Sequence, residues 1–303
     1  MKALNALWKF SRPHTIIGSV ISILTLYYIV YRDQEIFNLT YLIMALCIGI
    51  TCNVFIVGIN QIADVNIDKI NKPYLPIPSG ILSVHHAKII VFTALFICLV
   101  LSLLISPYLF GIVALSAAIG WAYSMPPLYL KRHHVTAALA IATVRGVLLN
   151  AGGFLVFNYE VNHSLEMPLN VVILTYFILA FSIVISWFKD LSDMEGDAKY
   201  KIKTLTIMYS PKVALITGNL LVAVAYLFTL YMKWDDFFYA ETPSFETRVL
   251  FIGHLVLFGC FIINAMSIRL GDLQSVKKFY KRFWWFFFAE YVVYLLAYAV
   301  EAF

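Results

Sequence analysis

Long runs of apolar residues, separated by short polar segments, make up most of this chain. A helix that crosses a bilayer needs about 20 mostly apolar residues, and nine runs approach that length. Their approximate bounds are 15–31, 41–60, 88–105, 107–124, 135–157, 168–188, 212–232, 247–268 and 282–300. No run alternates as the strands of a membrane barrel do, and a helix in lipid satisfies its own backbone groups. The pattern therefore predicts an all-α membrane protein with nine transmembrane helices.

The composition agrees with lipid as the solvent. Hydrophobic residues make up 62% of the chain and charged residues 13%, whereas a soluble domain is about half apolar and about a quarter charged. No polar stretch is long enough for a separate soluble domain, so we expect one integral-membrane domain over residues 1–303. The cysteines all lie in apolar runs without C-x-x-C spacing, which favours buried thiols over disulfides or a zinc site. The first helix lacks a cleavage site after it, so we expect it to be retained.

The positive charges indicate how the helices are oriented. If the N-terminus is cytoplasmic, the outer segments hold only Arg32, Lys233 and Arg248. Arg145 lies within a span, and the rest of the 22 lysines and arginines fall on cytoplasmic segments. Cytoplasmic loops of membrane proteins carry such an excess. The bias supports nine spans, with the N-terminus and the loops discussed below in the cytoplasm.

Two clusters of acidic residues follow the second and the sixth predicted span. Each cluster places its polar side chains on one helical face, at i, i+4, i+8 in the first and at i, i+3, i+7 in the second. The positions are Asn60, Asp64 and Asp68, and then Asp190, Asp193 and Asp197. Because four spans separate the clusters, we expect two four-helix halves followed by a ninth helix.

Five aspartates converging on one site would repel each other and therefore require cations. Oxygen ligands without histidine or cysteine fit Mg²⁺, which takes one or two carboxylates together with substrate phosphate oxygens. We therefore expect two Mg²⁺ ions and a diphosphate substrate. Nearby basic residues are placed to bind the outer phosphate oxygens. They are Lys72, Lys131, Arg132 and Lys189. The alternative is a solvated loop with scattered acids.

Other polar residues lie within or at the ends of the spans. Arg145 and Asn150 occupy the fifth span, where a charge is costly; the alternatives are substrate contact or a structural pairing. For His14 and Glu290 we expect structural roles. Tyr123 precedes two prolines that end the fourth span, which places it at the cytoplasmic mouth.

Five stretches of the chain resemble motifs of the UbiA superfamily of membrane prenyltransferases, and they look most like its homogentisate prenyltransferase branch. The stretches are Phe10-Ser-Arg-Pro-His-Thr15, Asn60-Gln-x-x-Asp64-x-x-x-Asp68, Tyr123-Ser-x-Pro-Pro-x-x-Leu-Lys-Arg132, Val144-Arg-Gly-x-x-x-Asn150 and Phe188-Lys-Asp-x-x-Asp-Met-Glu-Gly-Asp197. The paired aspartate motifs are highly specific for the superfamily, and the other stretches less so.

The resemblance implies nine helices around a central cavity, with both aspartate motifs at its cytoplasmic rim. It implies that the five aspartates and Asn60 bind Mg²⁺ and diphosphate, that Lys72, Lys131 and Lys189 bind phosphate, and that Tyr123 lines the donor site. The implied reaction transfers a long isoprenoid, such as phytyl or geranylgeranyl, from its diphosphate to homogentisate with loss of CO₂.

Alternative functions remain at this point. A quinone precursor, chlorophyllide or a glycerol-phosphate lipid is another possible acceptor. A cation-coupled transporter is the alternative from another class, because intramembrane acids and repeated halves suit that function too. The expected partners are the two substrates and membrane lipid, with no nucleic acid.

Overall fold

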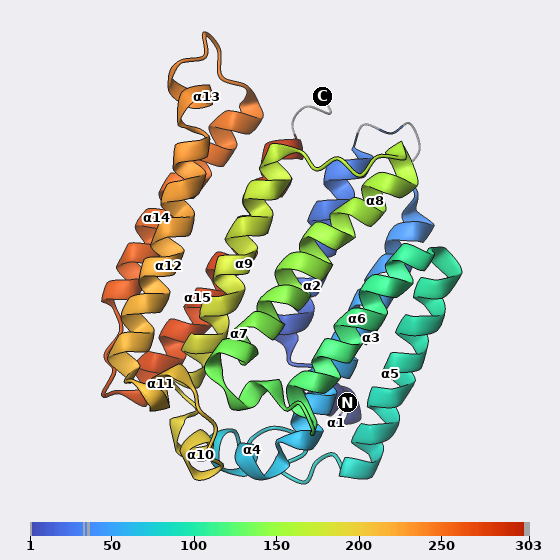
Figure 1. The fold of residues 1–303 in the computed structure, drawn as a ribbon, viewed down its shortest axis with the longest axis vertical. Coiled ribbons are helices and arrows are strands. Elements are labelled where there is room, and N and C mark those ends of the chain that lie inside the picture. The colour runs from blue at the N-terminus through green and yellow to red at the C-terminus, as the bar shows by residue number, and fades with distance from the viewer. Residues whose placement is uncertain (1, 33, 35–36, 300–303) are drawn as a thin grey trace.

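Long helices run side by side through the computed structural model, which describes residues 2–32, 34 and 37–299 (Figure 1). Eight of them are single α-helices: α2 (Pro13–Tyr31), α3 (Leu39–Ala63), α5 (Val84–Ile105), α6 (Pro107–Ser124), α9 (Leu169–Asp190), α12 (Pro211–Met232), α14 (Phe245–Met266) and α15 (Leu273–Ala299). Another consists of three consecutive pieces, α7 (His134–Ala142), the π-helical segment η2 (Thr143–Gly152) and α8 (Gly153–Asn162). All the regular elements of the described residues are helices, which confirms the all-α prediction.

Among the residues that the structure describes, eight helices, with α7–η2–α8 taken as one, are long and apolar enough to cross a membrane. The chain is therefore a multi-pass integral membrane protein. The ninth predicted span corresponds to α15, which begins at Leu273 instead of residue 282. Its first turns carry Lys277, Lys278, Lys281 and Arg282, and α15 is not among those eight helices in the described chain. The number of nine spans stays a prediction, and residue 300 lies outside the described residues.

Residues at the helix starts explain why several predicted edges are a few residues late. Pro13 and Pro211 occupy the first turns of α2 and α12, where a missing N–H costs nothing. Ser210 caps α12 by accepting from the Val213 N–H at 3.1 Å. These polar or cyclic residues lie outside the apolar runs but still belong to the helices.

The helices form two groups joined by α15. In the first group α3 packs against α2, α5 and α6, and in the second α9 packs against α7, η2 and α12, while α14 packs against α12. α15 contacts α2 of the first group and both α9 and α14 of the second. Glu290 of α15 is fully buried and pairs with His254 of α14, with 2.6 Å between Oε1 and Nε2, as a structural role requires.

Short helices cover one end of the bundle. α4 (Val65–Asn71) and α10 (Met194–Lys199) lie side by side there, and α1 (Lys2–Phe10) lies at the same end (Figure 1). The turn η1 (Leu130–Arg132) and the short helix α11 (Leu205–Met208) complete this end, whereas α13 (Trp234–Phe238) lies at the other. Because α4 follows α3 and α10 follows α9, both acidic clusters come to the same end of the molecule.

Candidate active site

The first acidic cluster extends across the junction of α3 and α4. The Asp64 N–H donates to the carbonyl of Asn60 at 2.9 Å, and the Asp68 N–H donates to the carbonyl of Asp64 at 2.7 Å. This helical hydrogen bonding keeps the three side chains in register through the junction. The Asn60 amide also donates to Asp64 Oδ2 at 3.0 Å, so it positions that carboxylate.

The second acidic cluster extends across the junction of α9 and α10. Asp190 is the last residue of α9 and Asp193 precedes the first residue of α10. The Asp193 N–H donates to the carbonyl of Asp190 at 3.3 Å, and the Asp197 N–H donates to the carbonyl of Asp193 at 3.1 Å. All three aspartates are buried, so their charges face a protein-lined space instead of bulk water.

Residues of both clusters line one cavity, here called the polar cavity. Ten of the thirteen predicted site residues line it: Asn60, Asp64, Asp68, Lys72, Tyr123, Lys131, Lys189, Asp190, Asp193 and Asp197. Its volume is about 40 Å³ in this arrangement. That space holds a water molecule or two, because lysine side chains occupy much of the region between the aspartates.

Four of the five aspartates each pair with one cation. The pairs are Lys131–Asp64, Arg12–Asp68, Lys189–Asp190 and Lys72–Asp193. Lys189 Nζ lies 3.2 Å from Asp190 Oδ1, whereas Arg12 Nη2 lies 3.9 Å from Asp68 Oδ2. The cations therefore neutralise most of the negative charge that the clusters bring together.

Asn71 connects the two short helices. Its amide donates to Asp197 Oδ1 at 3.4 Å, and its side-chain oxygen accepts from the Gly196 N–H at 2.8 Å. A Cβ on Gly196 would lie 2.6 Å from Asn71 Oδ1, so glycine is required for this close approach. The two clusters are thus held together by α4–α10 contacts as well as by ion pairs.

Burial and neighbouring charges give the aspartates different proton affinities. Burial, together with Asp190 and Asp193, raises the pKa of Asp197 to about 7. Burial also raises the pKa of Asp68 above its usual value, against the effect of Lys72. At Asp193 burial acts in the same direction, but Lys72 and Lys189 outweigh it and lower the pKa.

The donor set fits a hard divalent cation such as Mg²⁺. All of its acidic ligands are carboxylate oxygens, and Asp68 Oδ2 is buried without a hydrogen-bond partner. Among the described residues no three Asp, Glu, His or Cys side chains lie close enough to bind one ion by themselves. An ion held here would therefore need further ligands from phosphate oxygens or water.

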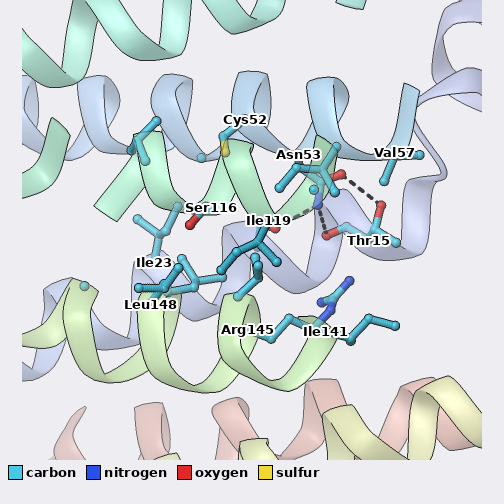
Figure 2. Close-up of a pocket in the computed structure, with 18 of the residues that line it drawn as sticks. Thr15, Ile23, Cys52, Asn53, Val57, Ser116, Ile119, Ile141, Arg145 and Leu148 are labelled. Atoms are coloured by element: carbon cyan, nitrogen blue, oxygen red, sulfur yellow. Dashed lines mark hydrogen bonds between the residues drawn. The ribbon is translucent and has the colours of Figure 1, made fainter. Parts of the chain in front are cut away.

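A second cavity, here called the apolar cavity, begins at the polar one. It measures about 240 Å³ and is lined mainly by α2, α3, α6 and the α7–η2–α8 helix (Figure 2). Both cavities share Arg12, Asn60, Tyr123 and Lys189 in their linings. The apolar cavity then continues toward Leu26 and other apolar residues, so a charged head and a hydrocarbon tail could occupy the two cavities together.

Three predicted site residues lie outside the polar cavity. Arg132 is exposed, while its neighbour Lys131 is buried and lines the cavity. Asn150 is buried elsewhere, where it donates to Thr175 Oγ1 at 2.7 Å and accepts from the Tyr291 hydroxyl at 2.9 Å. Arg145 lines the apolar cavity instead.

Some lining residues had no predicted role. Arg12 and Asn71 reach the polar cavity, while Asn53 and Trp284 line the apolar one. Asn71 follows Asp68 by three residues, and that helical spacing was the available signal. His14, expected to be structural, lines the apolar cavity with its ring centroid 4.8 Å from that of Trp284.

These features define a class of protein: a helical membrane protein with a carboxylate-rich and cationic mouth above an apolar cavity. The model of the UbiA prenyltransferase family matches residues 19–287. The chain therefore belongs to the UbiA prenyltransferase family and is a prenyltransferase.

Known relatives and solved structures agree with this assignment. Homogentisate phytyltransferase of Synechocystis sp. is 36% identical, with 98% of this chain and 96% of that protein covered. The chloroplastic homogentisate solanesyltransferase of Arabidopsis thaliana is 33% identical, with 96% of this chain and 78% of that protein covered. A UbiA homolog from Archaeoglobus fulgidus bound to GPP and Mg²⁺ shares the fold, with a TM-score of 0.65 at 17% identity and coverage of 95% of this chain and 99% of the other.

Proposed function

We propose that this prenyltransferase transfers a long isoprenoid from its diphosphate to homogentisate. The observation that carries the proposal is the opening of the polar cavity into the apolar one, at residues that line both. A prenyl diphosphate has the same two parts, a multiply charged head and a long hydrocarbon tail. The homogentisate phytyl- and solanesyltransferases among the relatives support the acceptor.

The polar cavity is the proposed diphosphate site. The aspartates of both clusters and Asn60 would hold two Mg²⁺ ions, and Lys72, Lys131 and Lys189 would bind phosphate oxygens. The Archaeoglobus homolog that holds GPP and Mg²⁺ supports this assignment. The bound metal supplies positive charge that stabilises the departing diphosphate.

Substrate binding requires the ion pairs of the polar cavity to change partners. In this arrangement the lysines neutralise the aspartates. A metal–diphosphate complex would provide a new anion for the lysines and a new cation for the aspartates. Each lysine can then turn to a phosphate oxygen while its former aspartate turns to a cation. This exchange avoids leaving a buried carboxylate unpaired, which would cost several kcal/mol.

The residues of the site then divide the chemistry between them. Cleavage of the allylic C–O bond sends the electron pair to the diphosphate, where the lysines stabilise the new charge, and leaves an allylic carbocation. The apolar cavity keeps water away from that cation. A ring carbon of the acceptor attacks the cation, and the ring carbon then loses its proton. In homogentisate the acetate side chain also loses CO₂ and takes up a proton to become a methyl group.

The apolar cavity is the proposed site of the isoprenoid tail. Along α3 it extends from Asn60 at the mouth to Ala45, a distance of about 22 Å at the helical rise per residue. An extended phytyl or geranylgeranyl chain is of similar length. The length of this cavity therefore favours a long donor over a short one.

The proposal includes the arrangement in the membrane. Residues 1–303 would form one membrane domain, with the N-terminus and both acidic clusters on the cytoplasmic side, as the distribution of lysine and arginine favours. A cation-coupled transporter is less well supported. Its ion site lies near the bilayer midplane, whereas both clusters here lie at one end of the bundle.

Product analysis tests the proposal. Purified protein in nanodiscs would be incubated with Mg²⁺, a series of prenyl diphosphates and a series of acceptors that includes homogentisate. We expect a prenylated methylquinol from homogentisate and none after EDTA treatment. Transfer only to a different acceptor would overturn the acceptor assignment and keep the reaction class. Absence of transfer to every acceptor would contradict the proposed function.

A further inference from the structure

Arg145 lies inside a membrane-spanning helix. Its cationic side chain has no carboxylate partner among the described residues. Its guanidinium instead lies against two aromatic rings, 5.1 Å from the Trp284 centroid and 5.8 Å from the Phe287 centroid. Ring faces attract a cation, but they provide no hydrogen-bond acceptors for the five N–H groups of an arginine. A charge at this depth calls for a functional explanation.

The local backbone directs Arg145 into the apolar cavity. It belongs to the π-helical segment η2, and such segments occur frequently at functional sites. The adjacent Gly146 packs so closely on α9 that a Cβ there would lie 2.5 Å from Leu179 Cδ2. Gly146 therefore faces α9, whereas the Arg145 side chain extends toward α2 on the side where Thr15 and Asn53 lie (Figure 2).

Other polar groups lie on this wall of the cavity. Asn53 of α3 accepts from Thr15 Oγ1 at 3.0 Å and donates to Ser19 Oγ at 3.0 Å. All three residues and Arg145 line the apolar cavity. Arg145 Nη1 approaches the Cβ position of Gly18 at 3.5 Å. Gly18 is about 7 Å along α2 from its first residue, Pro13, so the guanidinium lies just inside the mouth.

The diphosphate of the donor is a poor candidate for the anion that would pair with Arg145. The polar cavity already has Arg12, Lys72, Lys131 and Lys189 in its lining, and Arg145 does not line it. The tail of the donor is uncharged. The remaining substrate is the aromatic acceptor, whose ring must meet the donor carbon next to the diphosphate, at the junction of the two cavities.

We propose that Arg145 binds the carboxylate of the acceptor, and that it thereby selects aromatic acceptors that carry an acidic side chain. The inference rests on the proposed function, which supplies an acceptor with one carboxylate. A planar guanidinium pairs with a carboxylate through two parallel hydrogen bonds. Such a pair fixes the position of the ring, and it disfavours a neutral acceptor because the half-buried cation within the span would then remain unpaired.

Binding measurements on Arg145→Gln test this assignment. Labelled homogentisate would be titrated by equilibrium dialysis with Mg²⁺ and a non-reacting donor analogue present, and methylhydroquinone, which lacks the carboxylate, would be titrated as its competitor. We expect Arg145→Gln to weaken homogentisate binding about 100-fold. Methylhydroquinone and donor binding should change by less than about threefold, since neither uses the guanidinium.

Two further variants separate a specific effect from a general one. Arg145→Lys keeps the charge but loses the planar fork, so it should retain part of the preference for homogentisate over methylhydroquinone. Val147→Ala changes an exposed side chain in the same helical segment and should leave all affinities unchanged. Thermal unfolding of each variant in nanodiscs would identify a misfolded preparation.

These experiments distinguish an error in the carboxylate assignment from an error in the proposed function. Unchanged homogentisate binding in Arg145→Gln, or an equal loss for both ring compounds, would overturn the carboxylate assignment. Prenyl transfer by the wild type only to acceptors that lack a carboxylate would also overturn it, while leaving the prenyltransferase reaction intact. Absence of all transfer by the wild type would instead contradict the proposed function.

Discussion

Lys72, the residue that follows α4 in the first half of the chain, forms an ion pair with Asp193, the residue that precedes α10 in the second half. Its neighbour Asn71 forms hydrogen bonds with Gly196 and Asp197 of α10. The two halves are therefore joined at the acidic clusters themselves. Any ligand that binds between the clusters must replace the contact between Lys72 and Asp193.

Replacing Lys72 by Met should weaken donor binding. The change removes a proposed phosphate ligand and leaves the buried Asp193 without its nearest cation, so we expect the KM for the prenyl diphosphate to rise about 100-fold. Steady-state kinetics at saturating Mg²⁺ measure the effect. Lys69→Met is the matched control, because Lys69 lies three residues earlier, on α4, and is exposed. Equal effects of the two variants would argue against a phosphate contact at Lys72.

Mg²⁺ affinity should increase as the pH rises through neutrality. The pKa of Asp197 is raised to about 7, chiefly by burial, so this carboxyl is partly protonated at lower pH and must lose its proton to bind a cation. Below that pKa we expect the apparent affinity to rise about tenfold per pH unit and above it to level off. Mg²⁺ titrations of the wild type and of Asp197→Asn at several pH values would measure this dependence of affinity on pH. An unchanged slope in the variant would assign the proton to another group.

Filling the far end of the apolar cavity should shorten the preferred donor. Ala45 lines that end on α3, and a larger side chain there would occupy space that the end of a long tail requires. For Ala45→Phe we expect kcat/KM to fall about tenfold with geranylgeranyl diphosphate, and to stay near wild type with geranyl diphosphate, because each buried methylene of the tail contributes about 0.8 kcal/mol.

A lipid-facing substitution is the control for Ala45→Phe. Leu115 of α6 is exposed on the outside of the bundle, so Leu115→Phe should leave the preference between the two donors unchanged. Parallel losses with both donors in Ala45→Phe would mean that the tail lies elsewhere or that the helices have shifted.

Asn150 should matter for stability and not for substrate affinity. Its side chain joins Thr175 of α9 to Tyr291 of α15, and Asn150→Ala would remove one hydrogen bond from each of these side chains. We expect a loss of about 1–3 kcal/mol of stability, measured as a lower unfolding temperature in nanodiscs. The KM values for both substrates should be unchanged. A specific rise in the KM for the acceptor would instead assign Asn150 to substrate binding, as the sequence predicts.

The fold and the acidic clusters were predictable because each depends on local spacing. Apolar runs fix the long helices through their length, and the i, i+4 spacing of Asp64 and Asp68 survives the junction between α3 and α4. Equivalent positions in the two halves implied that the clusters meet. Individual ion pairs, such as Lys72 with Asp193, depend on the tertiary packing of α4 on α10, for which the sequence has no local signal.

The sequence could not distinguish neighbouring positions that face different surroundings. Lys131 and Arg132 are adjacent and both basic, yet one is buried in the polar cavity and the other is exposed. A polar residue within a span, such as Asn150, indicates only that a partner exists. Its partners, Thr175 and Tyr291, are themselves ordinary residues of apolar helices, so the structural role became visible only in the packed bundle.

The most direct test of the account is the release of labelled CO₂ from carboxyl-labelled homogentisate in the presence of prenyl diphosphate and Mg²⁺. Wild-type protein should release one CO₂ per prenylated quinol and lose activity with EDTA. Asp64→Asn and Asp190→Asn should each reduce the rate by about 1,000-fold or more, whereas Glu195→Gln, at an exposed position of α10, should not. A near-wild-type rate in either aspartate variant, or turnover without a divalent cation, would contradict the account.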